Sequence, residues 1–393
     1  MQMSLHIAHR FVSDRSQAFS QSIIREMTRQ NALYDSINLA QGYPDFDPPE
    51  LIKEAAIAAI RDGHNQYAIT WGTPVLRQAI AEKVGWYNGM TVDPDQHVTV
   101  TCGATEGMMA AMMAVVNPGD EVIVFEPYYE NYGPDTIVSG ARPVYIPLRA
   151  PDFSFDRDEL AAAFSPATKA IIINTPHNPT GKVFTPEELA FIAELCLRHD
   201  TLAITDEIYE HILYDGFTHC SMATLPGMAE RTITISGLSK SYSVTGWRIG
   251  YVIAPAEISE AVRRVHDFLT VGAPAPLQMA AVTALHIERG YYHELAAMYK
   301  HKRDLLLPVL REIGFKVFQP QGAYYLWADI RALTEMDGWD YAMHLVKEIG
   351  VATVPGGGFY NRRALGATSI RFTFSKKPET LYAAAQRLQR LRG

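Results

Sequence analysis

The chain has 393 residues, of which 48% are hydrophobic and 20% charged, and its formal net charge is −8. This length exceeds one ordinary hydrophobic core and predicts two domains, and the composition is typical of a soluble globular enzyme. The negative charge, with no basic run, argues against a nucleic-acid partner. The longest apolar run, Met108 to Val116, is far shorter than the ~20 residues that cross a bilayer, so we expect no membrane partner.

The three cysteines, Cys102, Cys196 and Cys220, show no close pairing. This spacing argues against a disulfide framework and against a cysteine zinc site, and we expect no bound metal. The first fifteen residues contain no secretory apolar region. Together these features predict a cytoplasmic protein.

Residues 1–47 are predicted to form an N-terminal arm and part of a smaller domain. Asp47 is expected to cap a helix with Pro48 and Pro49 in its first turn. Thr73 followed by Pro74 gives the same signal for a second helix.

Residues 48–280 read as the larger domain, because short β-branched runs alternate there with helical stretches. A capping box at Thr185 and Glu188 begins one of these helices. Near-continuous apolar strands alternating with helices predict an α/β fold with a mostly parallel sheet covered on both faces. Seven strands are expected, at 97–101, 121–125, 143–146, 170–174, 202–205, 232–235 and 249–254.

Residues 281–393 read as a smaller C-terminal α+β domain, completed by the N-terminal segment. Strands are expected at 315–318, 324–328, 351–354 and 369–374, and helices at 305–313, 341–349 and 379–391.

Polar residues follow successive strands of the large domain, where ligands bind on parallel sheets. Each has an ordinary explanation: a tight turn, a core aromatic, a helix N-cap for Asp206, or a surface lysine for Lys240. It is not credible that all of these residues follow successive strands by chance. The set comprises Gly103-Ala104-Thr105, Tyr129, Asn178, Asp206 with Tyr209, and Lys240 with Arg248.

This inventory fits pyridoxal 5′-phosphate (PLP). The cofactor needs a lysine for a Schiff base, an acid at the ring nitrogen, donors to the ring oxygen and a phosphate site. A glycine-containing helix start with free N–H groups binds anions. An aspartate ending an apolar strand needs a cationic partner such as a protonated ring nitrogen.

The sequence resembles the class I/II aminotransferases, of PLP fold type I, over essentially its whole length. Within the class it looks most similar to the kynurenine/glutamine and methionine aminotransferase branch. The matching motifs are Asn178-Pro-Thr-Gly181, Asp206-Glu-Ile-Tyr209, Ser239-Lys240, Gly246-Trp-Arg248-Ile-Gly250 and Ser369-Ile-Arg371-Phe.

The resemblance implies a role for each matching position. Lys240 would bind PLP covalently and move the substrate proton, and Asp206 would hold the ring nitrogen protonated. Asn178 and Tyr209 would bond the ring oxygen, and Tyr129 would stack on the ring. Gly103, Ala104, Thr105 and Arg248 would bind the phosphate. Arg371 would clamp the substrate α-carboxylate, which its planar fork suits, helped by Asn178 and the Gly42 backbone. Tyr67 would reach the phosphate of a neighbouring subunit, which implies a homodimer.

Two departures from the family pattern leave questions open. Many relatives have a phosphate-binding serine where this chain has Gly237, so that role falls to Ser236 or Ser239. The turn beginning at Pro355 is closer to the aspartate/alanine/diaminopimelate branches.

The predicted activity is transamination between an L-amino acid, whether aromatic, sulfur-containing or glutamine-like, and a 2-oxo acid. An aspartate/alanine/diaminopimelate-type aminotransferase and a cysteine-conjugate β-lyase on the same scaffold remain alternatives. Tyr43, Tyr128 and Tyr132 give a hint of an aromatic or thioether pocket.

Other classes of protein fit the sequence less well. A hydrolase nucleophile elbow would need glycine at Ser241, and a P-loop would need Ser or Thr at Val183. A PLP-binding regulator would need an attached DNA-binding module, for which the chain shows no basic patch.

Overall fold

The computed structural model describes residues 11–392 and is built around a seven-stranded sheet. Its strand order is β2-β8-β7-β6-β5-β3-β4, and β8 alone runs antiparallel to its neighbours. This confirms the predicted mostly parallel sheet of seven strands. The strands are β2 (Val98–Thr101), β3 (Glu121–Glu126), β4 (Arg142–Pro147), β5 (Thr168–Asn174), β6 (Leu202–Asp206), β7 (Thr232–Gly237) and β8 (Gly250–Ile253).

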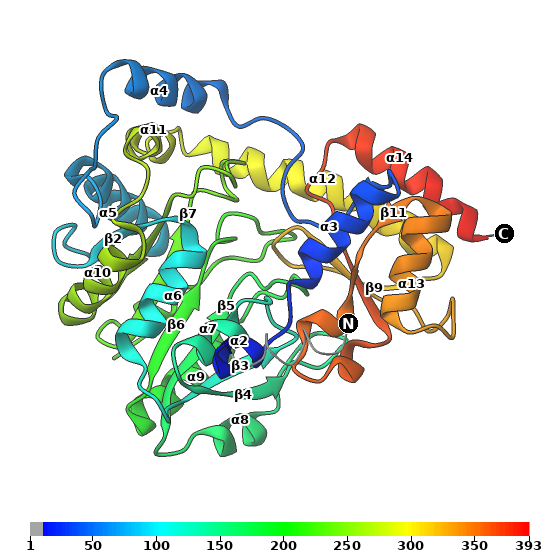
Figure 1. The fold of residues 1–393 in the computed structure, drawn as a ribbon, viewed down its shortest axis with the longest axis horizontal. Coiled ribbons are helices and arrows are strands. Elements are labelled where there is room, and N and C mark those ends of the chain that lie inside the picture. The colour runs from blue at the N-terminus through cyan, green and yellow to red at the C-terminus, as the bar shows by residue number, and fades with distance from the viewer. Residues whose placement is uncertain (1–10, 393) are drawn as a thin grey trace.

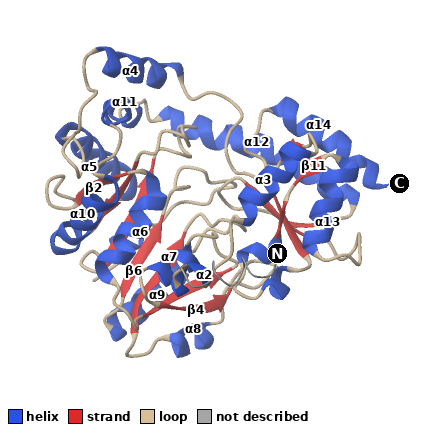
Figure 2. Cartoon of the chain, viewed as in Figure 1, coloured by secondary structure: helices blue, strands red, loops and turns tan. Residues whose placement is uncertain are grey.

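Helices surround this sheet and continue into the C-terminal part of the chain (Figures 1 and 2). Shorter 3₁₀ turns lie at Met222–Thr224, Gly356–Phe359, Arg363–Gly366 and Gln389–Arg392, and a π-helical turn lies at Leu345–Ile349. The α-helices are α2 (Asp14–Gln17), α3 (Ile23–Leu33), α4 (Glu50–Arg61), α5 (Pro74–Asn88), α6 (Gly103–Val115), α7 (Tyr132–Val138), α8 (Arg157–Ala163), α9 (Pro186–His199), α10 (Ala256–Thr270), α11 (Ala275–Leu285), α12 (Gly290–Ile313), α13 (Gly338–His344) and α14 (Pro378–Leu388). Within residues 11–392, no helix has the length and apolar character needed to cross a bilayer.

The central strands are apolar on both faces because helices cover both. In β3, Val122 and Val124 pack with α6, whereas Ile123 and Phe125 pack with α9. Successive side chains of a strand point to opposite faces, so each face of β3 contributes to a different core. All six residues of β3 are buried. This double burial explains why the strand reads as a continuous hydrophobic run rather than an alternating one.

The parallel strands β3, β5, β6 and β7 bring their carboxyl ends to the same edge of the sheet. Strand β7 then turns back into β8 through residues 238–249, and Gly237 pairs with Gly250 at the base of this connection. A side chain on either glycine would collide with backbone of a neighbouring segment. The predicted lysine turn between two buried strands is therefore confirmed, and it opens at the carboxyl edge.

The C-terminal part has its own sheets and incorporates the N-terminal segment. An antiparallel sheet has the order β12 (Val354–Pro355), β13 (Ser369–Thr373), β10 (Tyr325–Asp329) and β9 (Lys316–Phe318). Strand β1 (Ile37–Asn38) pairs in parallel with β11 (Val351–Ala352), and helix α3 lies against β11 (Figure 1). Residues near both ends of the sequence thus approach the carboxyl edge of the large sheet from one side.

One of the predicted helix starts is corrected by the structure. Pro49, rather than Asp47, occupies the cap of α4, and the Asp47 carboxylate instead lies 3.3 Å from the Lys53 ammonium. The start at Thr73 is confirmed, because Thr73 occupies the cap of α5 and Pro74 its first turn, although the Thr73 hydroxyl makes no capping bond. The capping box at Thr185 and Glu188 is confirmed, with both reciprocal bonds present.

A buried polar network lies behind the loop that follows β6. Glu207, Glu210 and His219 place ligand atoms within 4.8 Å of one another, but the Lys83 ammonium already contacts Glu210 at 2.5 Å. Burial alone would raise the pKa of Glu210, yet the adjacent Lys83 ammonium holds it well below its usual range. The lysine thus acts as the internal cation of the network, which fixes the segment between Asp206 and Glu210.

Replacing Lys83 with methionine is expected to lower the free energy of unfolding by about 3–5 kcal/mol, because Glu210 would stay buried without a cation. The double variant Lys83→Met/Glu210→Gln should recover much of this loss, since both charges are then absent. Urea denaturation of the three proteins measures both values. Equal instability of the single and double variants would contradict this account.

Candidate active site

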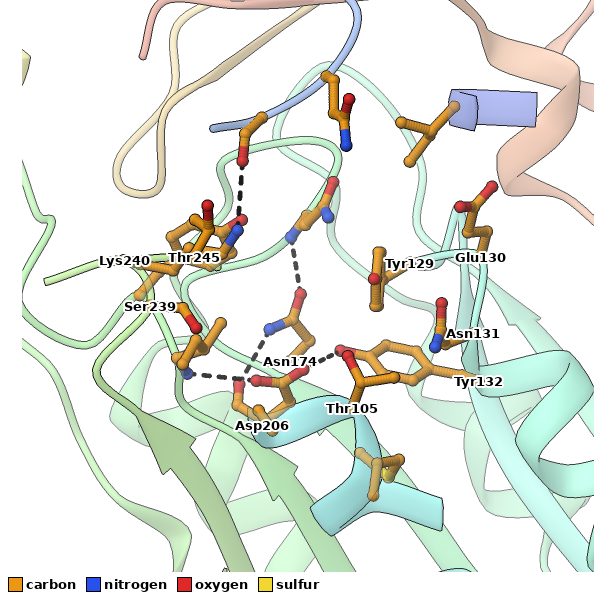
Figure 3. Close-up of a pocket in the computed structure, with 18 of the residues that line it drawn as sticks. Thr105, Tyr129, Glu130, Asn131, Tyr132, Asn174, Asp206, Ser239, Lys240 and Thr245 are labelled. Atoms are coloured by element: carbon orange, nitrogen blue, oxygen red, sulfur yellow. Dashed lines mark hydrogen bonds between the residues drawn. The ribbon is translucent and has the colours of Figure 1, made fainter. Parts of the chain in front are cut away.

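Residues from five strand ends and from the C-terminal part line one cavity of about 190 Å³ (Figure 3). The structure therefore brings together most of the predicted site residues. The predicted residues that line it are Gly42, Ala104, Thr105, Tyr129, Asn178, Asp206, Tyr209, Ser239, Lys240, Arg248 and Arg371.

Lys240 reaches the cavity from the turn between β7 and β8. Its Nζ donates a hydrogen bond to the Gly42 carbonyl at 3.2 Å and lies 5.8 and 5.7 Å from the ring centroids of Tyr209 and Tyr324. Burial, reinforced by the positive charge of Arg248, lowers the pKa of Lys240 to about 8. The neutral form of this amine, which a nucleophile or base requires, is therefore easier to reach than in an ordinary lysine.

Asp206 ends β6 with its carboxylate buried in the cavity. The Tyr132 hydroxyl donates to Asp206 Oδ2 at 2.7 Å, and the Ile208 N–H donates to Oδ1 at 3.2 Å (Figure 3). Burial raises the pKa of Asp206, and these two hydrogen bonds oppose the rise. A cation beside this carboxylate would oppose it further. The bond to Ile208 N–H resembles a cap, but no helix follows it.

Asn174 couples the loop carrying Asn178 to the end of β6. Its amide donates to the Asp206 backbone carbonyl at 2.9 Å, and its Oδ1 accepts from the Asn178 N–H at 2.7 Å (Figure 3). Tyr209 is buried and its hydroxyl lies 2.8 Å from that of Tyr325. Burial raises the pKa of Tyr209 well above 10, so its hydroxyl stays protonated and can donate a hydrogen bond.

The start of α6 has the chemical features of an anion site. Gly103 has φ +79°, and a side chain there would collide with the Arg248 guanidinium. The first N–H groups of this 13-residue helix have no intrahelical acceptor, and Ser239 and Arg248 line the same cavity. Of the two candidate serines, Ser236 is excluded, because its buried hydroxyl donates to Glu210 at 2.8 Å on the other face of β7.

Arg371, in β13, is fully buried without a carboxylate partner among residues 11–392. Its guanidinium donates to Asn178 Oδ1 at 2.7 Å and to the Ala40 carbonyl at 2.8 Å, and its Nε has no partner. The rings of Tyr325 and Phe359 pack against it, 4.2 and 4.8 Å away. A buried guanidinium paired only with neutral groups is costly, so this arrangement favours an anionic ligand.

Three of the predicted tyrosines lie away from this cavity. Tyr67 is 87% exposed and lies in a surface depression beside Cys102. Tyr128 is buried beside Tyr145, and the Tyr43 ring is partly exposed under Lys376. Of the three tyrosines hinting at an aromatic pocket, only Tyr132 lines the cavity.

Several lining residues had no role predicted from the sequence, among them Arg25, Glu130, Asn131 and Asp135. Asp135 is 4% exposed, and its Oδ2 has no hydrogen-bond partner among the described residues. Burial and then the nearby Asp206 raise the pKa of Asp135 to about 8. The spacing of Asp135 from Tyr132, one turn along α7, was the available signal, because both side chains then face one way.

Asp135 predicts a specific pH dependence of stability in cofactor-free protein. Its folded pKa is raised, so its favourable contribution is complete below about pH 4 and is lost as pH rises to about 8. Asp135→Asn should therefore leave Tm unchanged at pH 4 and raise it at pH 9, by about 1 °C for each kcal/mol recovered. Thermal melts from pH 4 to 9 measure the difference, and a pH-independent difference would contradict it.

The chemistry of the donor set fits PLP. An amine, a buried carboxylate, a buried hydroxyl and a helix start with an arginine surround one cavity. Arg371 offers a separate anion site on the opposite side of Asn178. The fold and this site together define a PLP-dependent transaminase.

Comparison with known proteins identifies the family. The family model described as aminotransferase class I and II matches residues 34–388. The chain is 40% identical to a probable N-succinyldiaminopimelate aminotransferase of Mycobacterium tuberculosis, over 95% of this chain and 97% of that protein. It is 38% identical to the methionine aminotransferase of Escherichia coli (94% and 96%) and 35% identical to human kynurenine–oxoglutarate transaminase 1 (93% and 94%).

Solved structures agree. The N-succinyldiaminopimelate aminotransferase of M. tuberculosis superposes with a TM-score of 0.94 at 39% identity, covering 97% of this chain and all of that one. Aspartate aminotransferase from Thermus thermophilus with maleate gives 0.90 at 34% identity, covering 97% and 99%. The chain belongs to the class I and II aminotransferases. The predicted resemblance, the transaminase activity and the PLP requirement are thereby confirmed.

Proposed function

We propose that this transaminase uses Lys240 as its covalent anchor and proton carrier, and Arg371 as its α-carboxylate clamp. The observation that carries this assignment is the buried Arg371 guanidinium without an acid partner, across the cavity from an amine of lowered pKa. An amino acid and a 2-oxo acid share the carboxylate that Arg371 would bind. One clamp would therefore serve both halves of the reaction.

The other residues of the cavity would orient the cofactor and adjust its reactivity. Asp206, held by Tyr132, would keep a proton on the ring nitrogen, because a buried carboxylate stabilises the cation beside it. Tyr209 and Asn178 would donate to the ring oxygen, and Tyr129 would lie against the ring. The N–H groups of Gly103, Ala104 and Thr105, with Ser239 and Arg248, would hold the phosphate.

When bound, PLP supplies the carbonyl carbon that exchanges with the amino group and a ring that accepts electrons from the substrate Cα. Lys240, once released, would take the proton from Cα and return it on the cofactor side. Its lowered pKa suits this role, because a base works best with a pKa near the working pH.

The amino donor is an L-amino acid whose side chain is aromatic, sulfur-containing or glutamine-like. The alternative is a donor of the aspartate/alanine/diaminopimelate type. A cysteine-conjugate β-lyase would share the anchor and the clamp. Single-turnover spectroscopy separates the reactions. An amino donor should convert the colour of lysine-bound PLP to that of pyridoxamine phosphate with one equivalent of 2-oxo acid. Ammonia and pyruvate without that conversion would indicate the lyase, and no response to any donor would overturn the assignment.

The oligomeric state and the domain organisation of the chain are part of the proposed function. Tyr67, exposed in a single chain, would reach the phosphate of a second copy in a homodimer. The chain would divide at residues 47/48 and 280/281 into an arm, a large domain and a small domain, and would work in the cytoplasm. Mass photometry, together with a Tyr67→Phe effect on PLP affinity, tests the shared site.

A further inference from the structure

His266 is a fully buried histidine on α10, and both of its ring nitrogens face hydrogen-bond acceptors. Its Nδ1 lies 3.0 Å from each carboxylate oxygen of Glu106, and its Nε2 lies 2.9 Å from the Thr70 carbonyl. A neutral imidazole can donate from only one nitrogen. Its other nitrogen would then turn a lone pair toward an acceptor, so this geometry requires the imidazolium.

The groups around the ring favour its charged form. Burial alone would lower the pKa of His266, but the hydrogen bond and the charge of the Glu106 carboxylate raise it above 6.5, and Asp267 on the same helix contributes. The Thr270 hydroxyl donates to the His266 carbonyl at 3.3 Å. Its hydrogen is therefore already engaged, and toward Nδ1, also 3.3 Å away, it can act as an acceptor.

Two further titratable groups lie beside this pair, and neither competes for the imidazolium. Arg263, one turn earlier on α10, donates to the Val98 carbonyl at 2.8 Å. The Cys102 thiol donates to the Gly272 carbonyl at 3.5 Å, and burial raises the pKa of Cys102, so the thiol stays uncharged at neutral pH. The Glu106 carboxylate is therefore the charge that the imidazolium balances.

Glu106 connects the buried pair to the start of α6. It lies in the first turn of this helix, and its Oε2 accepts from the Cys102 N–H at 3.0 Å. The N–H groups proposed to bind the phosphate belong to the same turn. A phosphate monoester carries close to two negative charges at neutral pH, and an unbalanced carboxylate in that turn would repel it.

We infer that His266 is a positioning residue of the cofactor phosphate site, whose imidazolium cancels the charge of Glu106 so that the start of α6 can bind a dianion. This inference rests on the phosphate site proposed above. Thr70 belongs to the same loop as Tyr67, so the ring also joins the start of α6 to the loop proposed to reach a second subunit.

The test compares PLP with pyridoxal, which lacks the phosphate, as ligands of the full-length protein. Both aldehydes can form the coloured complex with Lys240, so absorbance titrations give a dissociation constant for each. Their ratio, the phosphate preference, reports the phosphate site alone because ionisation of Lys240 affects both ligands alike. His266→Gln, which keeps one donor without the charge, should lower the phosphate preference at pH 7 by about 5- to 30-fold, as for a partly buried charge at a helix end.

A second substitution should reverse this loss. Glu106→Gln in the His266→Gln background removes both charges and should restore the phosphate preference to within about twofold of wild type. His286→Gln is the matched control, because that ring pairs with Glu82 at the surface. It should leave both dissociation constants unchanged.

The pH profile gives an independent readout. The contribution of the imidazolium is complete at low pH and is lost as pH rises through its raised pKa. The phosphate preference of the wild type should therefore fall between pH 7 and 9, whereas the phosphate remains a dianion throughout. The double variant should show no such fall.

The outcomes separate this inference from the proposed function. If neither aldehyde gives the coloured complex, Lys240 is not the anchor, and equilibrium dialysis then supplies the same two constants. If His266→Gln weakens both ligands equally, if Glu106→Gln restores nothing, or if the wild type and the double variant share one pH profile, His266 only supports the fold and the inference is overturned.

Discussion

Replacing Lys240 with alanine is expected to lower kcat/KM for transamination by about 10⁴-fold or more. The variant loses both the amine that would bind PLP and the base that would move the Cα proton, and a positioned acid–base group alone contributes about 10²–10⁴-fold. The visible absorbance of the lysine-bound cofactor should also disappear. Steady-state kinetics and a difference spectrum after dialysis against PLP measure the two effects.

Lys240→Arg is the matched control, because it keeps a positive charge beside the Gly42 carbonyl but offers no amine of lowered pKa. It should lose activity and colour as completely as the alanine variant. PLP should still bind to both variants non-covalently through the start of α6 and Arg248. If either variant keeps the colour and a tenth of the activity, another residue is the anchor.

The large sheet and its strand ends were predictable because their signals are local. Buried strands read as short β-branched runs, and parallel strands must place their following residues at one edge. Asn178, Asp206 and Lys240 could therefore be assigned to one cavity before their distances were known. The strand order was not predicted, because it depends on contacts between elements far apart in sequence.

One choice stayed open and one helix cap was wrong, because local sequence does not decide either. Ser236 and Ser239 look alike as hydroxyl donors, but the strand alternation of β7 turns Ser236 toward Glu210. Asp47 looked like a cap because prolines follow it, but Pro49 itself occupies the cap position and the helix begins at Glu50. To choose between two neighbouring residues for one role, one must know in which direction each side chain points.

The residues that shape the substrate cavity were the least predictable. Arg25 and Glu130 are more than a hundred positions apart, and helix α3 brings them together through Ser22. Nothing in either local pattern differs from an ordinary surface helix or turn. The helical spacing of Tyr132 and Asp135 was a weak signal that both face the same way. Their place in the site follows only from the structure, in which Tyr132 donates to Asp206 and the charge of Asp206 raises the pKa of Asp135.

Replacing Arg371 with methionine is expected to lower kcat/KM for amino donors and for 2-oxo acids by roughly 30- to 3000-fold. Removing one partner of a buried charge pair costs about 2–5 kcal/mol, and each 1.4 kcal/mol is a factor of ten. Both half-reactions should weaken by similar factors, because the donor and the acceptor present the same carboxylate. Single-turnover kinetics in each direction measures this.

The stability of the Arg371→Met variant should change far less than its activity. The Arg371 guanidinium is buried against Tyr325 and Phe359 without an acid, and replacing a buried charge with an apolar group of similar volume is often neutral or stabilising. The lost bonds to Asn178 and Ala40 offset part of that gain. Tm should therefore fall by no more than about 2 °C.

Arg331→Met is the matched control, since that guanidinium pairs with Asp329 near the surface and lies outside the cavity. It should change neither kinetic constant. PLP affinity separates the two possible roles of Arg371. A substrate clamp leaves the dissociation constant of the cofactor unchanged when Arg371 becomes methionine. If the variant instead lost PLP binding and its Tm fell by ten or more degrees, Arg371 would be a structural residue. Its buried charge would then have to be balanced by an anion other than the substrate.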